Sequence, residues 1–218
     1  MRAFLAEPGP TLMEFLTAWH GPPDRPGTRH DWHRDAPAPL IEWFDVTTRW
    51  TEPVTVQNDF VDLEKLEVEA GLVTFWVENQ GVWEWAYQVG EPDPFVFDRE
   101  AEDDAAWSPT GYRLTTFLVR IAMFEAVMGA EHGASAPLVQ RDQRDAILAP
   151  LEAVPGPAWN WPHSGGSRFY AGDGVLALGG PDTSNHSSVE SAPWGIFIAS
   201  QDPTKLAYLA DLTDIEWV

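Results

Sequence analysis

Two segments near the start of the chain carry apolar residues at the spacing of amphipathic helices. In the first segment, Thr11 and Glu14 form a capping box, in which each residue satisfies an amide at the start of the helix. Its apolar residues recur every three or four positions: Leu12, Phe15, Leu16 and Trp19. The second segment begins at about Pro39, and one side of it holds Leu40, Trp43, Phe44 and Thr47. We therefore expect two helices, separated by an exposed, proline-rich connector.

Residues 72–89 show a strand pattern, with two β-rich runs around a glycine-containing turn, and this pattern predicts a β-hairpin. A three-residue loop, Asn79 to Gly81, places Glu78 opposite Val82, and residues that pair directly share a face. One face is then entirely apolar and holds Val73, Phe75, Val77, Trp83, Trp85, Tyr87 and Val89. The other face holds Leu72, Thr74, Trp76, Glu78, Val82, Glu84, Ala86 and Gln88. A two-residue loop would mix the two faces, so burial favours the three-residue loop.

The middle of the chain predicts one more strand and a third helix. Residues 93–97 are expected to form an edge strand, where the missing amide of Pro94 does no harm. The helix is expected to have Thr115 as its cap and to end at Gly129. Its buried side comprises Leu114, Phe117, Leu118, Ile121 and Met128.

Strand patterns return in the last third of the chain. Residues 167–171 and 175–178 flank a turn at Gly172 to Gly174, and residues 194–199 form a further apolar run. The remaining expected elements are a fourth helix between Pro137 and Leu151, a mobile polar loop at Gly179 to Ser191, and a short last helix from Asp202. Together these elements predict a single α+β domain over residues 1–218, with a central, mostly antiparallel sheet flanked by helices.

Charge excludes some classes of function. The chain has 34 acidic and 13 basic residues, so its net charge is −21. Nucleic acids and anionic membranes are therefore not expected as partners, because proteins bind both through basic surfaces. Residues 1–110 carry 22 acidic and 7 basic residues, against 12 and 6 in the rest, so the acidity is concentrated in the first half. Such a field attracts basic proteins, although acidity can also serve solubility alone.

Composition also limits the chemistry and the expected compartment. The chain has no cysteine, which excludes disulfides, thiolate zinc sites and cysteine nucleophiles. The apolar stretch at the N-terminus is too short for the core of a signal peptide, and no apolar run approaches the roughly 18 residues of a membrane-spanning helix. We therefore expect a cytoplasmic protein.

Several short motifs follow one another in the first 130 residues. They are Trp19-His20-Gly21, Leu40-Ile41-Glu42-Trp43, the run from Phe75 to Trp85 with its Glu-Asn-Gln-Gly-Val turn, Asp93-Pro94-Phe95-Val96, Trp107 and Phe117-Leu118. In this order they resemble the SUKH superfamily over about residues 10–130, and residues 131–218 look compatible with completion of the same domain. The resemblance implies an α+β fold with a central sheet and no established catalytic centre. Many bacterial members are regarded as immunity proteins, which neutralise a cognate toxin, often a nuclease, by binding it. Others are interaction or regulatory modules. The long, proline-rich insert between the first two helices departs from the family pattern.

Four groups of residues are candidates for catalysis, phosphate binding or metal binding. Glu78 and Glu84 share a face of the predicted hairpin at roughly 7–8 Å, a separation that a carboxylate-pair hydrolase could use, although a polar outer face needs acidic residues anyway. His30 and His33 have no third metal ligand at a motif spacing. The Gly172 to Gly174 segment is interpreted as a turn, because no helix or lysine follows it as in a phosphate loop. Serines near His163 and His186 form no recognised nucleophile motif, and a triad assembled only in three dimensions stays open.

Exposed tryptophans and acidic residues are the remaining candidates for a binding surface. Four tryptophans are expected to be exposed, and exposed tryptophans are favoured interface anchors: Trp32, Trp76, Trp107 and Trp159. The predicted partner-binding residues are Glu78, Glu84, Glu100, Glu102, Asp103, Asp104, Trp76 and Trp107. We expect a non-enzymatic protein that occludes a protein partner, possible partners being basic toxins such as nucleases, with no cofactor and no metal. The alternatives are a general regulatory interaction protein and a carboxylate-dependent hydrolase.

Overall fold

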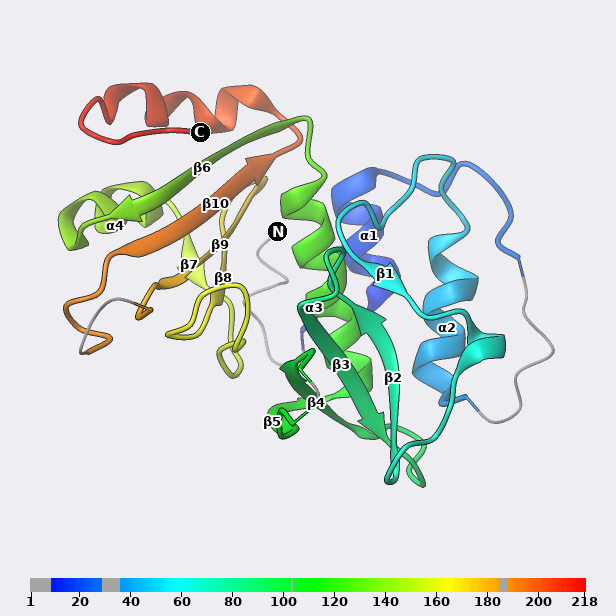
Figure 1. Ribbon diagram of the computed structural model, residues 1–218. Helices are drawn as coiled ribbons and strands as arrows, with labels where there is room; N and C mark the ends of the chain where they lie inside the picture. The colour runs from blue at the N-terminus through cyan, green and yellow to red at the C-terminus, as the bar shows by residue number, and fades with distance from the viewer. Residues whose placement is uncertain (1–8, 29–35, 103, 185–187) are drawn as a thin grey trace. The chain divides into compact units, whose positions relative to one another are not determined.

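A computed structural model of the chain (Figure 1) describes residues 9–28, 36–102, 104–184 and 188–218. The chain divides into two units, with the boundary after Glu125. We call Thr11–Glu125 the N-terminal unit and Ala126–Val218 the C-terminal unit. Each unit contains helices and its own antiparallel sheet. The predicted α+β class is confirmed, and the strands are divided between two sheets.

Local sequence signals position the first helices of the N-terminal unit. Helix α1, Leu12–His20, starts at the predicted capping box, in which Glu14 N donates to Thr11 Oγ1 at 3.3 Å and Thr11 N donates to Glu14 Oε2 at 2.8 Å. Helix α2, Ala38–Thr47, has a proline in its first turn, as expected. Both helices therefore confirm the predictions.

Helix α3, Leu114–Met128, confirms the third predicted helix, but its predicted cap is wrong. Thr115 lies inside the helix, and its backbone N–H donates to Asp93 Oδ1 at 2.8 Å. A carboxylate at this position also interacts favourably with the helix dipole. The N-terminus of α3 is thus capped from a turn that lies 22 residues earlier in the chain.

The sheet of the N-terminal unit has the order β1-β2-β3-β4-β5. Its strands are β1, Asp59–Phe60; β2, Leu72–Val77; β3, Trp83–Gln88; β4, Phe95–Glu100; and β5, Ser108–Arg113, and a short 3-10 helix, η2, spans Leu63–Lys65. The prediction that residues 93–97 form an edge strand is wrong, because β5 pairs with the far side of β4. Strand β5 begins Ser-Pro-Thr-Gly, and this segment shows no apolar alternation by which it could have been recognised.

The β2–β3 hairpin is present, but its register changes part-way along the strands. Leu72, Val73 and Thr74 pair with Gln88, Tyr87 and Ala86 as predicted. Phe75 then forms a bulge, and beyond it Trp76 pairs with Trp85 and Val77 with Glu84. The predicted three-residue loop is therefore wrong, since Glu78 N donates to Trp83 O across a four-residue loop. The bulge turns Trp76 inward and Val77 outward, opposite to the prediction.

The bulge lets two consecutive aromatic residues face the same core. Phe75 and Trp76 are both fully buried. Trp76 contacts Phe117 and Phe124 of α3 with ring centroids 6.3 and 5.9 Å apart, and Phe75 contacts Phe117 at 6.3 Å. Helix α2 reaches the same core through Trp43, which stacks on Phe60 of β1 at 4.7 Å. Helices α2 and α3 therefore cover one face of the sheet.

The sheet of the C-terminal unit has the order β6-β10-β9-β8-β7. Its elements are β6, His132–Val139; α4, Arg141–Leu148; β7, Glu152–Ala153; β8, Arg168–Ala171; β9, Val175–Pro181; β10, Trp194–Ser200; and the 3-10 helix η3, Pro203–Asp211. The predicted hairpin at 172–174, the strand at 194–199 and the last short helix are confirmed. Strand β6 was missed, and the predicted loop at 179–191 is wrong at its start, because β9 continues to Pro181. Residues 185–187 of that loop lie outside the described part of the chain.

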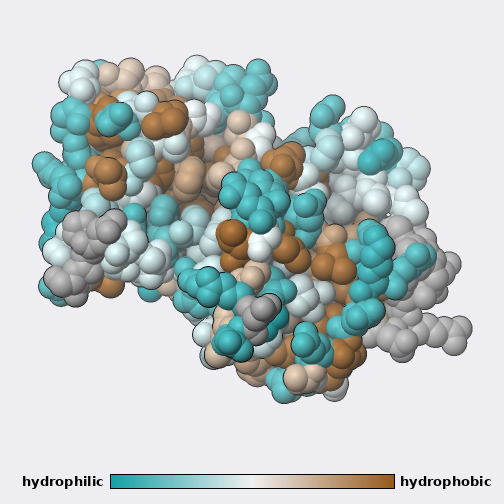
Figure 2. Space-filling model, viewed as in Figure 1, coloured by the Kyte–Doolittle hydropathy of each residue, from teal (hydrophilic) through white to brown (hydrophobic). Residues whose placement is uncertain are grey.

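Strands β6, β9 and β10 supply much of the core of the C-terminal unit. It contains Ala136, Val139, Ile147, Val175, Ala177, Ile196, Ile198, Leu209 and Ile215. Among the described residues, no helix is both long enough and apolar enough to cross a membrane. Figure 2 shows hydrophilic residues over large parts of the visible surface, with hydrophobic residues in separate groups.

Candidate functional site

Two of the four tryptophans that were expected to be exposed are buried. Trp76 has no exposed surface, because the bulge at Phe75 places its ring in the core beside Trp85, with ring centroids 4.1 Å apart. Trp159 is 3% exposed and packs edge-on against Phe169 at 5.2 Å. The prediction that these two residues are exposed is therefore wrong, and Trp76, the one of them that was predicted to bind a partner, has no surface to offer one.

Trp32, with Asp103, His30 and His33, lies outside the described residues.

Glu78 holds the turn of the hairpin and is 6% exposed. Its Oε2 accepts hydrogen bonds from Gln80 N at 2.8 Å and Val82 N at 3.4 Å. Because Val77 pairs with Glu84, Glu78 lies on the opposite face of the sheet from Glu84. The predicted carboxylate pair on one face is therefore wrong, and the geometry on which the hydrolase alternative depended is absent.

The other predicted partner-binding residues that the structure describes lie on the paired ends of β3 and β4 and in the chain between β4 and β5. Strand β3 pairs Trp83 with Glu100 of β4, and Ala101 N donates to Val82 O at 2.9 Å. The chain then turns at Glu102, whose carbonyl accepts from Ala105 N at 3.1 Å, and reaches Trp107. We call the set Glu84, Glu100, Glu102, Asp104 and Trp107 the acidic corner. These five of the eight predicted residues thus lie along the paired ends of β3 and β4 and the chain that follows, with Glu84 and Glu100 on opposite faces of the sheet.

Arg99 links two members of the acidic corner. Its Nε lies 2.5 Å from Glu84 Oε1, and its guanidinium carbon lies 4.3 Å from the ring centroid of Trp107. The Glu84 and Arg99 side chains are only 16% and 22% exposed. The partly buried ion pair holds the Arg99 guanidinium, and its cation–π contact stabilises the observed position of the Trp107 ring. Arg99 was not predicted from the sequence as a functional residue, although a lone basic residue within a strand and beside an acidic run is a signal for it.

The exposed carboxylates of the acidic corner are not neutralised. Glu100, Glu102 and Asp104 are exposed, and among the described residues none of them has a basic partner within ion-pair distance. Arg99, the nearest basic residue along the strand, is engaged by Glu84. The end of β4 and the turn after it therefore present three negative charges to solvent, and the half-buried Trp107 follows within the same stretch of chain.

The structure gives no support to a histidine-based nucleophile in the C-terminal unit. Ser164 Oγ contacts Thr183 Oγ1 at 3.0 Å and Asp182 Oδ1 at 3.3 Å, not His163. The His163 ring stacks on Phe197, its Nε2 is buried without a hydrogen-bond partner, and burial lowers its pKa. His186 lies outside the described residues. Within the parts of the chain that the structure describes, no group of three or more acidic or histidine side chains is placed to hold a metal.

A pocket in the N-terminal unit was not predicted from the sequence. It lies between α2 and residues 55–60 and has a volume of about 340 Å³. One wall is held by Glu125, which is 1% exposed and accepts backbone hydrogen bonds from Val56, Gln57 and Asn58. A single acidic residue within the apolar helix 114–128 was the one sequence signal for this arrangement, because a buried carboxylate requires donors.

Comparison of the chain with protein-family models, with curated proteins and with solved structures finds no significant match.

Proposed function

We propose that the chain is a cytoplasmic protein-binding module of the immunity-protein class, which neutralises a basic toxin such as a nuclease by covering it. The observation that carries this proposal is the acidic corner, where three exposed carboxylates without basic partners in the described residues lie on the same stretch of chain as the half-buried Trp107. The resemblance of residues 10–130 to the SUKH superfamily supports the same function. A net charge of −21 favours a basic partner over nucleic acid.

The two kinds of side chain in the acidic corner have different roles in this proposal. Glu100, Glu102 and Asp104 accelerate the encounter with a basic surface, an effect that salt screens over about 8–10 Å. Trp107 supplies the apolar contact that slows dissociation, since tryptophans are common among the residues that dominate binding energy. Arg99 positions the ring before the partner arrives, so less side-chain entropy is lost on binding.

The first experiment compares the wild type with two variants of equal charge. In the corner variant, Glu100→Gln, Glu102→Gln and Asp104→Asn remove three negative charges. In the control variant, three other exposed acidic residues of the same unit are changed, Glu64→Gln, Glu67→Gln and Glu69→Gln. Each tagged protein is used to capture partners from native lysate at low and at high salt.

The proposal expects one basic protein to bind the wild type and the control variant at low salt, and to be lost from the corner variant. Expressed alone, that protein should be toxic, and co-expression of the wild type should restore growth. Equal capture by the two triple variants would refute the role of the acidic corner. A captured partner without toxicity would instead favour the alternative of a regulatory interaction module.

A further inference from the structure

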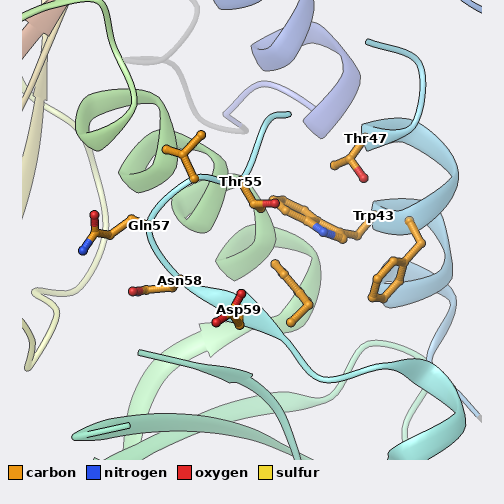
Figure 3. Close-up of a pocket in the computed structure, with 9 residues that line it drawn as sticks. Trp43, Thr47, Thr55, Gln57, Asn58 and Asp59 are labelled. Carbon is orange, nitrogen blue, oxygen red and sulfur yellow. The ribbon is translucent and has the colours of Figure 1, made fainter. Parts of the chain in front are cut away.

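The pocket between α2 and residues 55–60 is separate from the acidic corner and has a composition of its own. Trp43, Phe44 and Thr47 line it from α2, and the segment from Thr55 to Phe60 lines it from the other side (Figure 3). Its volume of about 340 Å³ is at the lower end of the range of small-molecule sites, which runs from about 300 to 1,000 Å³. The pocket can therefore hold one small group.

The backbone amides of the 55–60 wall are already used. Val56 N and Gln57 N donate to Glu125 Oε2 at 2.7 and 2.8 Å, and Asn58 N donates to Glu125 Oε1 at 3.1 Å. In Figure 3 the side chains of Gln57 and Asn58 point away from α2. Three successive donors thus turn toward the interior, and they are not available to an anion in the pocket.

Acceptor groups, in contrast, remain free around the pocket. Among the described residues, the hydroxyls of Thr47 and Thr55 make no side-chain hydrogen bond, and the exposed carboxylate of Asp59 has no basic partner. Figure 3 shows Thr47 on the α2 side, and Thr55 and Asp59 on the opposite wall. Asp59 is also close enough to Glu125 for its charge to raise the pKa of that buried group. Among the described residues that line the pocket, Asp59 is the only one that carries a charge.

Aromatic rings complete the lining. Trp43 and Phe60 are stacked at 4.7 Å, and Phe44 meets Phe60 edge-on at 5.7 Å with planes 76° apart. Trp43 is only 2% exposed, whereas Phe44 and Phe60 are half-buried, so these two phenylalanines supply the accessible ring surface. The faces of aromatic rings attract cations, and a planar cation can also stack on them.

We propose that this pocket binds a guanidinium group. A guanidinium carries five N–H donors in one plane and a positive charge, which fits two free hydroxyls, a carboxylate and aromatic walls better than a lysine ammonium does. The group can come from a free small molecule or from an arginine side chain of a protein. The proposal stands apart from the acidic corner, with which the pocket shares no residue.

Titration with free arginine tests this site directly. Binding is followed by the backbone amide resonances of Thr47 and Thr55 and by the indole resonance of Trp43, with citrulline as the probe of the same shape but without charge. Arginine should shift these resonances to saturation, citrulline should leave them unchanged, and lysine should bind more weakly than arginine. Equal shifts with arginine and citrulline, or shifts elsewhere in the molecule only, would overturn the proposal.

Variants sharpen the test. Asp59→Asn should weaken arginine binding about tenfold, the effect of losing one charged hydrogen-bond partner. The control Glu67→Gln removes the same charge from another exposed position of the unit and should leave the affinity unchanged. Equal affinities in the two variants would overturn the proposal. If Asp59→Asn does not fold, Thr47→Val serves as a second variant, because valine keeps the shape of the side chain and removes its hydroxyl. An unchanged affinity of Thr47→Val for arginine would also overturn the proposal.

Two further measurements address two questions. The first is whether the guanidinium group comes from a small molecule or from a protein, and the second is whether the pocket binds independently of the acidic corner. A capped Gly-Arg-Gly peptide that binds as well as free arginine supports a protein arginine as the ligand, whereas binding of free arginine alone supports a small molecule. The corner variant of Glu100, Glu102 and Asp104 should bind arginine as the wild type does. Failure of partner capture therefore leaves this proposal intact, and failure of arginine binding leaves the proposed function intact.

Discussion

Glu125 offers the sharpest test of the energetics of the N-terminal unit. Its buried carboxylate accepts three backbone hydrogen bonds and holds residues 56–58 in place. A hydrogen bond to a charged group contributes about 1.5–3 kcal/mol, so three would contribute about 5–9 kcal/mol if nothing opposed them. Burial of the charge does oppose them, because desolvation raises the pKa of Glu125 above its ordinary value of 4.5. Val56 is an exposed residue and Asn58 a buried one, so once the carboxylate is removed, water reaches the amide of Val56 more readily than that of Asn58. We expect Glu125→Ala to lower the free energy of unfolding by about 2–4 kcal/mol.

Urea denaturation followed by far-UV circular dichroism measures this loss. Hydrogen exchange shows which part of the chain is affected, since the amide of Asn58 should lose its protection from exchange in the variant. The matched control is Glu131→Ala, which removes an exposed carboxylate just beyond the end of α3 and should change stability by less than about 0.5 kcal/mol. If Glu125→Ala is as stable as this control, the three hydrogen bonds do not hold the segment as described.

The pH dependence of the same site follows from its raised pKa. Burial is the largest cause, and the charge of Asp59 acts in the same direction. The folded state therefore binds the Glu125 proton more tightly than the unfolded state does. Stability from this group is fully present below about pH 4.5, the ordinary pKa, and is lost as pH rises through the folded pKa. We therefore subtract the free energy of unfolding of Glu125→Gln from that of the wild type. This difference should fall as pH rises from about 4.5 to the folded pKa of Glu125, and it should be constant at higher pH. A difference that increases with pH would show that the three amides lower the pKa more than burial raises it.

Three further substitutions test other contacts. Trp76→Ala should cost about 3–5 kcal/mol in urea denaturation, as expected for a fully buried tryptophan, whereas Trp107→Ala should cost less than about 1 kcal/mol. A Cβ at residue 195 would overlap the imidazole of His163, so Gly195→Ala should destabilise the C-terminal unit by about 1–3 kcal/mol, and His163→Ala in the same chain should recover part of that loss. Arg99→Met removes the ion pair and the cation–π contact of the acidic corner. The indole N–H of Trp107 should then exchange faster with solvent, and an unchanged rate would show that Arg99 does not position the ring.

Elements with local determinants could be predicted from the sequence, and elements with distant ones could not. The capping box at Thr11 and Glu14 lies within four residues, so α1 is recognisable without any tertiary structure. The cap of α3 comes instead from Asp93, and its position depends on the turn that precedes β4. Strands β1 and β5 are defined by pairing with their neighbours, because neither carries an apolar alternation of its own.

The same distinction applies to the candidate sites. The exposed carboxylates of the acidic corner, Glu100, Glu102 and Asp104, could be anticipated because they follow one another along the chain and only had to be exposed. Trp76 was misplaced because one extra residue in β2 inverts every side chain beyond it. The pocket could not be anticipated, since it needs α2, the 55–60 segment and Glu125 together.

The bulge at Phe75 also determines where this hairpin can change in length. Removal of Phe75 would leave Val73 and Trp76 facing the core, with Thr74 and Val77 on the outer face, so that β2 becomes a regular strand of alternating side chains. Removal of Thr74, in contrast, would place Val73 next to Phe75. Two core residues would then follow each other, and the alternation of side chains would be broken in the half of β2 that is distant from the hairpin loop. During divergence of related sequences, the strand can therefore lose one residue at the bulge while the residues on either side of it keep their faces.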